Sequence, residues 1–75
     1  MNHVHLTTKE IEIIKLLAQE KTVKEISSIL GCSKRTIAKH KENLFLKTSS
    51  LTIIGIILYG IKEGIIQINV YARNT

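Results

Sequence analysis

A dense group of cationic side chains stands near the middle of this chain and could bind a polyanion such as nucleic acid. Residues 33–47 carry five cations and one carboxylate, a net charge of +4, whereas residues 1–32 are neutral and the last 28 residues add +1. Concentration of charge in one segment is typical of a polyanion-binding surface. Charge alone leaves an ordinary solvated helix face equally open. The cations are Lys34, Arg35, Lys39, Lys41 and Lys47, and the carboxylate is Glu42.

Other chemistries have little support in the sequence. Paired carboxylates, a nucleophile with its base and a Gly-rich phosphate loop are all missing, so we expect no catalytic residues, no enzyme activity and no cofactor. His40 and the lone Cys32 have no further ligands at metal spacing, so we expect no metal site. The three aromatic residues, Phe45, Tyr59 and Tyr71, are too few to stack a single strand, which favours duplex over single-stranded partners.

Length and composition predict one small domain over residues 1–75. A chain of 75 residues without a disulfide pair must build its core from its 44% apolar residues or obtain help from a partner. The lone cysteine and the lack of a signal-peptide pattern favour a cytoplasmic location. An apolar run of 11 residues before Lys62 is far shorter than the ~20 needed to cross a membrane. Whether the chain is a whole protein or the end of a longer one stays open.

Two helix starts only eleven residues apart predict a helix-turn-helix. Thr22 and Glu25 have capping-box spacing and open a helix over about 22–30, which Gly31 can end in a left-handed conformation. Ser33 is the next N-cap candidate and opens a basic helix over about 33–47. So short a connection makes the two helices cross steeply, as in domains that place the second helix in the DNA major groove.

An amphipathic helix is predicted ahead of this pair, over about 7–20. Thr7 and Glu10 again have capping-box spacing. Apolar residues at helical spacing should form the core-facing stripes of the first three helices. We expect Ile11, Ile14, Leu17 and Ala18 in the first, Ile26, Ile29 and Leu30 in the second, and Ile37, Leu44 and Phe45 in the third.

Residues 51–66 allow two structures from their pattern alone. Their β-branched residues favour two strands joined by the turn GIKEG, which would make a winged helix. The apolar spacing of about 3.5 residues instead favours a fourth helix over about 52–63. The spacing runs through Leu51, Ile54, Ile57 or Leu58, Ile61 and Ile65.

The stretch LTTKEIEIIKLLAQEKTVKEISSILGCSKRTIAKHKENLFLK resembles the DNA-binding domain of LuxR/GerE-type transcription regulators. The resemblance runs without gaps from Leu6 to Ile66, about four-fifths of the chain, and favours the fourth helix over the winged alternative. The matching residues are Leu6, Thr7 and Glu10 of the opening motif, Lys24, Glu25 and Ile26, then Ser33, Thr36, Ile37, His40, Asn43, Leu44 and Lys47, and finally Gly64, Ile65 and Ile66.

The resemblance implies an all-α, four-helix domain that binds double-stranded DNA of specific sequence as a homodimer and regulates transcription. Helices two and three would form the helix-turn-helix, and helix four would serve dimerisation. By position, Ala38, Lys39 and Glu42 would face base edges. The residues expected to hold phosphates or brace the helix are Thr36, His40, Asn43 and Lys47, with Lys34, Arg35 and Lys41 on the DNA backbone.

Several positions depart from the family pattern. Ala38 stands where the family often has Lys or Arg, so a contact is lost or replaced by one with a thymine methyl group. Thr48 and Ser49 replace the usual Leu and Gly. Thr52 is followed by Gly55 at the position of the usual Glu, so the expected capping box of helix four is missing.

Helix four is also more apolar than is usual in the family, which suggests a hydrophobic dimer completed by the tail over 67–75. The predicted interface residues are Ile53, Ile54, Leu58 and Tyr59. A different function would use the same surface: residues 51–63 could dock onto another regulator without specific DNA binding. A promoter reader that needs RNA polymerase instead of a second copy is a further alternative. The sequence gives no operator, regulated gene, controlling signal or direction of regulation.

Overall fold

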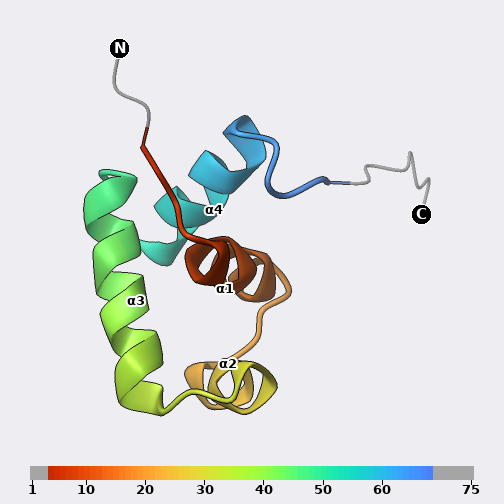
Figure 1. The fold of residues 1–75 in the computed structure, drawn as a ribbon. Helices are drawn as coiled ribbons and strands as arrows, with labels where there is room; N and C mark the ends of the chain where they lie inside the picture. The colour runs from red at the N-terminus through yellow and green to blue at the C-terminus, as the bar shows by residue number, and fades with distance from the viewer. Residues whose placement is uncertain (1–3, 69–75) are drawn as a thin grey trace, which may run out of the picture.

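A computed structural model describes residues 4–68, which form four α-helices and contain no strand (Figure 1). The helices are α1 (Thr8–Ala18), α2 (Val23–Leu30), α3 (Lys34–Lys47) and α4 (Ile53–Lys62). The all-α class predicted from the sequence is therefore confirmed, and the winged hairpin considered for residues 51–66 is wrong.

Side-chain caps begin the first three helices where the sequence predicts them. The backbone N–H of Glu10 donates to the Thr7 hydroxyl at 3.1 Å, and the Glu10 carboxylate accepts from the Thr7 N–H at 2.9 Å. Thr22 and Glu25 repeat both bonds at the start of α2, at 3.1 and 2.8 Å. Because these caps satisfy N–H groups that a helix leaves unpaired, they fix where each helix begins.

The turn between α2 and α3 is short and closed by local hydrogen bonds. Gly31 ends α2 with φ at +66°, in the left-handed region that glycine adopts at little cost. The Cys32 N–H donates to the Ser27 carbonyl at 3.0 Å, and the Ser27 hydroxyl donates to the Cys32 carbonyl. Ser33 then caps α3 by accepting from the Thr36 N–H at 3.1 Å. The predicted helix-turn-helix connection therefore needs only Gly31, Cys32 and Ser33.

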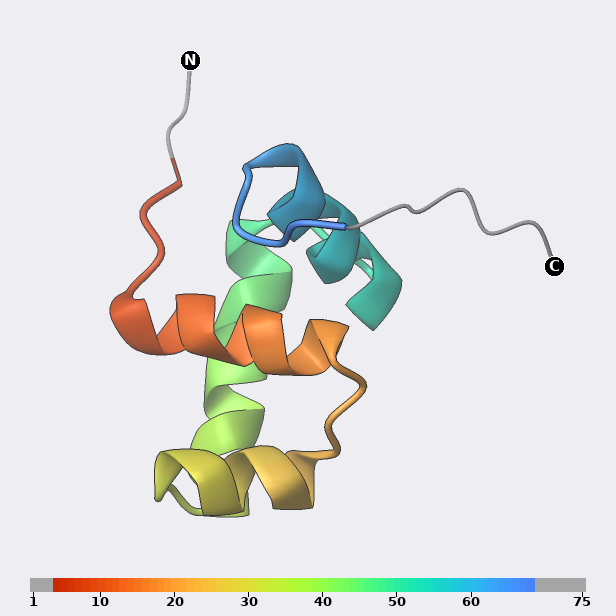
Figure 2. The same ribbon diagram turned by 90° about the vertical axis from the view of Figure 1, so that its right-hand side faces the viewer.

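The four helices pack so that α3 lies along one side of the molecule. α1 packs against α4 and α3, and α2 packs against α3. Figure 1 shows the other three helices on the same side of α3, and Figure 2 shows α1 and α2 running across its direction. One long side of α3 is therefore left without a partner helix.

The core is made of branched aliphatic side chains from every helix, and the burial of three isoleucines differs from the predicted stripes. Ile13 is fully buried although the predicted stripe of α1 omits it, and Ile11 is only half-buried. Ile29 was predicted to face inward but is 55% exposed, and it borders an open hollow between α2 and α1. The buried set is Ile13, Ile14, Leu17, Ile26, Ile37, Leu44 and Ile56.

α4 packs closely on α1 at Gly60. At its start, α4 has only one of the two hydrogen bonds of a capping box. A Cβ atom at Gly60 would lie 2.7 Å from the Ile66 side chain and 2.9 Å from that of Ile14, so only glycine permits this approach. Thr52 caps α4 by accepting from the Gly55 N–H at 3.3 Å. The reciprocal bond is absent because Gly55 has no side chain, as the sequence predicts.

Ser49, in the connection between α3 and α4, provides a test of backbone strain. Its φ is +53°, which is costly for a residue with a Cβ atom. We expect Ser49→Gly to raise the free energy of unfolding by about 0.5–1 kcal/mol in urea titration. Ser28→Gly, at an exposed helical position in α2, should lower it by about 0.5–1 kcal/mol. A loss of stability in both variants would contradict the strain at Ser49.

Candidate nucleic-acid interface

Only a narrow side of α3 is buried. Ile37 and Leu44 are its two fully buried residues, and they lie two turns apart on one side of the helix. The opposite side therefore faces solvent along the whole length of the helix.

The structure puts most of the predicted DNA-binding residues on the exposed part of α3. Thr36 lies there, but its hydroxyl is also within 2.9 Å of the Ser33 hydroxyl, so it extends the cap. The exposed residues are Lys34, Arg35, Thr36, Ala38, Lys39 and Glu42, and the half-buried ones are His40, Lys41, Asn43 and Lys47.

Lys39 and Glu42 form an exposed ion pair one turn apart on the open side of α3. The Lys39 Nζ lies 3.5 Å from the Glu42 Oε1. The Lys39 side chain is 71% exposed and the Glu42 side chain is 67% exposed. Such a surface pair contributes little to stability because both charges are well hydrated. It leaves both groups accessible to an incoming ligand.

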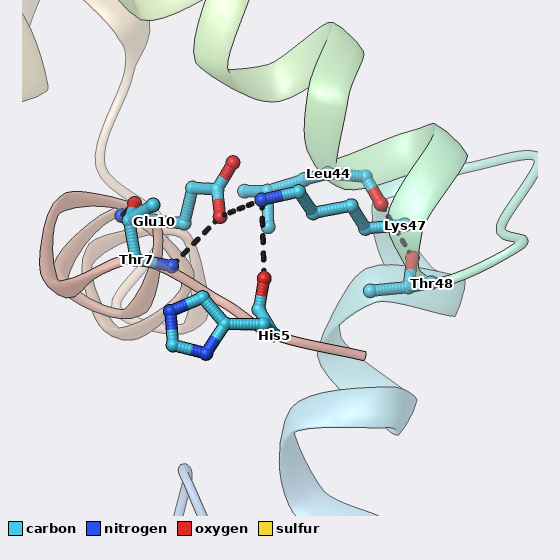
Figure 3. A network of polar contacts seen from close by, with 6 residues as sticks. All are labelled: His5, Thr7, Glu10, Leu44, Lys47 and Thr48. Carbon is cyan, nitrogen blue, oxygen red and sulfur yellow. Dashed lines mark hydrogen bonds and ion pairs between the residues drawn. The ribbon is translucent and has the colours of Figure 1, made fainter. Parts of the chain in front are cut away.

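Lys47 differs from the other cations because its ammonium group is engaged within the fold (Figure 3). Its Nζ lies 2.8 Å from Glu10 Oε1 and donates to the His5 carbonyl at 3.1 Å. The Glu10 side chain is 3% exposed and that of Lys47 is 34% exposed. Of the two roles that the sequence leaves open for Lys47, bracing the helix is the one that these contacts support.

The Glu10 carboxylate accepts hydrogen bonds from two different parts of the fold. It accepts from the Thr7 N–H in the cap of α1 and from Lys47 at the end of α3. Burial raises the pKa of the Glu10 carboxyl, but the Lys47 ammonium and the Thr7 hydrogen bonds outweigh it and hold the pKa below its ordinary value. The carboxylate therefore stays ionised and ties the start of α1 to the end of the basic helix.

Sequence reasoning assigned Glu10 only to the cap and missed this ion pair. Glu10 and Lys47 are 37 residues apart, and one sequence contains no signal that couples two positions at that distance. The pair follows from the packing of the end of α3 against α1, which only the structure shows.

The exposed side of α4 carries a second, apolar surface. Ile54 is 69% exposed and Leu58 is 59% exposed, and Leu51 just before the helix is 96% exposed. Of the other two predicted interface residues, Ile53 packs against the core and Tyr59 is half-buried. The tail over 67–75, predicted to complete a dimer, lies outside the described residues from 69 onward.

Two other kinds of site have no basis within residues 4–68. No cluster of three or more His, Cys, Asp or Glu side chains is placed to hold a metal ion there. None of the described helices combines the length and apolar character that crossing a membrane requires.

A four-helix domain with an exposed, basic third helix after a three-residue turn is a helix-turn-helix domain. Residues 4–52, about two-thirds of the chain, match the family described as bacterial regulatory proteins, luxR family. The chain belongs to this family, as the resemblance in its sequence predicts. α4 begins one residue beyond the matched range.

Two individual relatives match the chain over a longer range than the family model does. It is 35% identical over 63 residues to an uncharacterized response regulatory protein, YgeK, of Escherichia coli, and 34% identical over 62 residues to the transcriptional regulatory protein MctR of Rhizobium johnstonii. These alignments cover 84% and 83% of this chain but only 43% and 29% of those proteins. The spore germination protein GerE of Bacillus subtilis is 45% identical over 42 residues, which are 56% of this chain and 57% of GerE.

The Glu10–Lys47 pair predicts a loss of stability in acid. Because the pKa of Glu10 is lower in the folded chain than its ordinary value of 4.5, its contribution is complete above that value and disappears as the pH falls through the folded pKa. We expect Glu10→Gln, which retains the cap but loses the charge, to lower the free energy of unfolding by about 1–3 kcal/mol at neutral pH. The difference from the unmodified chain should shrink as the pH falls below 4.5 and through the lower pKa of the folded chain.

Urea titration across this pH range measures the effect, and Glu12→Gln is the matched control. Glu12 is on the same helix and makes an exposed pair with Lys9 at 3.9 Å, so its loss should change stability by about 0.5 kcal/mol or less. If the two variants lose the same stability at neutral pH, the buried pair does not have the role assigned to it.

Proposed function

We propose that this chain binds double-stranded DNA of specific sequence as a homodimer, through α3, and so regulates transcription. The observation that carries the proposal is the unpartnered side of α3, which presents cations from a helix-turn-helix of the luxR family. An exposed helix of this kind has the dimensions to enter the major groove.

The side chains of α3 divide into two groups by chemistry. Lys34, Arg35 and Thr36 belong to its first turn, where helix N–H groups and the helix dipole also attract phosphate. Together with Lys41 they would hold the DNA backbone. Ala38, Lys39 and Glu42 are exposed farther along the helix and would face base edges. His40 and Asn43, both half-buried, would support the backbone contacts or the helix itself.

A homodimer would give the complex its symmetry. Two copies related by a two-fold axis present two α3 helices to successive major grooves and therefore read an inverted repeat. The exposed side chains of Ile54 and Leu58 offer the apolar contact for such a dimer, with Ile53 and Tyr59 beside them. Association would remove from water the apolar surface that the single chain leaves exposed.

The names of the relatives support a role in regulation. MctR is described as a transcriptional regulatory protein and YgeK as a response regulatory protein, and both are more than twice as long as the segment they share with this chain. A DNA-binding domain can account for the transcriptional regulation that the name of MctR describes. No controlling signal is assigned to this chain on that basis.

Selection of bound duplexes from a random DNA library at about 0.1 M salt tests the proposal, because both specific and unspecific binding survive at that ionic strength. Enrichment of an inverted repeat would support a dimeric reader of sequence. Retention without enrichment would mean that the chain binds only the DNA backbone, and no retention would overturn the proposal.

Lys39→Ala should weaken binding to the selected duplex by about 1–3 kcal/mol and relax the preference at one position of each half-site. Lys15→Ala is the control, since Lys15 is an exposed cation of α1 that is not on α3. Fluorescence anisotropy with the selected and scrambled duplexes measures both effects. An equal loss on all duplexes would move Lys39 from the base edges to a phosphate.

Leu58→Glu should shift the chain to a monomer, because a dimer would then bury two carboxylates in an apolar contact. Ile29→Glu is the control, since Ile29 has a similar exposure, 55% against 59%, but is on α2. Sedimentation equilibrium at high micromolar concentration distinguishes the two. A monomeric unmodified chain would contradict the hydrophobic dimer, and a dimeric Leu58→Glu variant would place the interface elsewhere.

The apolar side of α4 also supports a second candidate, a protein-interaction module that docks onto another regulator without specific DNA binding. Its basis is the exposure of Leu51, Ile54 and Leu58 in the single chain. Under this alternative the chain would be retained by no duplex in the selection, whereas the variant Leu58→Glu would still lose its protein partner.

A further inference from the structure

A small hollow with a mainly apolar lining lies on the open side of α3. It is lined by Ala38, Lys41, Glu42 and Phe45, which follow one another at intervals of three, one and three residues along the helix. Ala38 and Glu42 are exposed, whereas Lys41 and Phe45 are half-buried. Phe45 also packs against the hydrophobic core, and this contact restricts the movement of its side chain.

Alanine at position 38 is what leaves the hollow open. Side chains three and four residues apart are neighbours on a helix, so a bulkier side chain at position 38 would stand beside Lys41 and Glu42 and take up space at this edge of the hollow. The methyl group of Ala38 instead forms one wall, and the aromatic ring of Phe45 forms another. The charged heads of Lys41 and Glu42 stand around an apolar centre.

The charges on this side of α3 select the part of DNA that the hollow can approach. The Glu42 carboxylate borders the hollow and would repel a phosphate placed there. Lys39 lies 3.5 Å from this carboxylate and balances its charge. Lys41, on the other border of the hollow, is left to contact the DNA backbone beside it. The apolar centre between these charges suits base edges, and the only apolar group that unmodified DNA presents in the major groove is the C5-methyl group of thymine.

We infer that the hollow formed by Ala38 and Phe45 receives the methyl group of a thymine in each half-site. This inference rests on the proposed function and adds to it the identity of one base. Glu42 then lies beside the methylated base and can accept a hydrogen bond from the amino group of a neighbouring cytosine.

Replacement of thymine by deoxyuridine tests the inference, because it removes the methyl group and leaves base pairing intact. Each thymine of the selected duplex is replaced in turn, and affinity is measured by anisotropy. We expect one position per half-site to show about a fourfold loss, the factor that corresponds to about 0.8 kcal/mol for one buried methyl-sized group.

Variants of Ala38 connect the effect to the hollow. Ala38→Gly removes one wall, and Ala38→Ser puts a hydroxyl group beside the methyl, so in both the affinity ratio of thymine to deoxyuridine should fall toward one. Leu46→Ala is the control, since Leu46 is a 75% exposed residue of α3 outside the hollow. Its ratio should stay at about four. Because each ratio is taken within one variant, general changes in affinity or stability cancel.

The outcomes separate this inference from the function on which it rests. Specific binding of a duplex with no loss at any deoxyuridine, or with the loss unchanged in both Ala38 variants, would overturn the hollow as a methyl site and leave DNA binding intact. A selected half-site without thymine would do the same. Failure to bind any duplex would overturn the proposed function itself, and the methyl site with it.

Discussion

The buried carboxylate of Glu10 is the constraint around which the domain is arranged. A charge in an interior must be paired, and this one is paired twice, with the N-cap of α1 and with Lys47 at the end of α3. Lys47 also donates to the His5 carbonyl, so the segment before α1 is held at the same point. A single ionised group thus ties the far end of the basic helix to α1, next to the hydrophobic contacts of Leu44 and Phe45.

Only two fully buried side chains of α3 hold the rest of this helix on the hydrophobic core. Ile37 and Leu44 are its fully buried residues, and α2, α1 and α4 all pack on that one side. Residues that the core does not use are free to carry charge, which is why a 14-residue helix can present cations along its open side. The steep crossing imposed by the turn at Gly31 leaves that side without a partner helix.

The sequence predicted the parts of this structure that local rules determine. Caps at Thr7, Thr22 and Ser33 and the left-handed Gly31 depend on neighbours within a few residues, so the first three helices and their order could be foreseen. The fourth helix competed with a hairpin on pattern alone, and the family resemblance decided between them. Packing depends on distant residues, and there the prediction was incomplete. Ile29 fits an inward stripe by spacing but is exposed, whereas Ile13 and Ile56, which no predicted stripe includes, are fully buried. Ile54 and Leu58 are exposed, as expected of the residues assigned to an interface. The Glu10–Lys47 pair and the hollow beside Phe45 were missed for the same reason.

If α3 binds DNA as proposed, its composition would separate affinity from selectivity. Its first turn has two cations and no carboxylate, and this is where unpaired N–H groups already favour phosphate. One and two turns later the exposed residues include Ala38 and Glu42, neither of which can strengthen attraction to the backbone. A carboxylate on a DNA-facing helix reduces affinity for every sequence, unless a base offers it a hydrogen-bond donor. Under the proposed function, Glu42 would therefore weaken binding to most duplexes and favour those in which a base offers its carboxylate a hydrogen-bond donor.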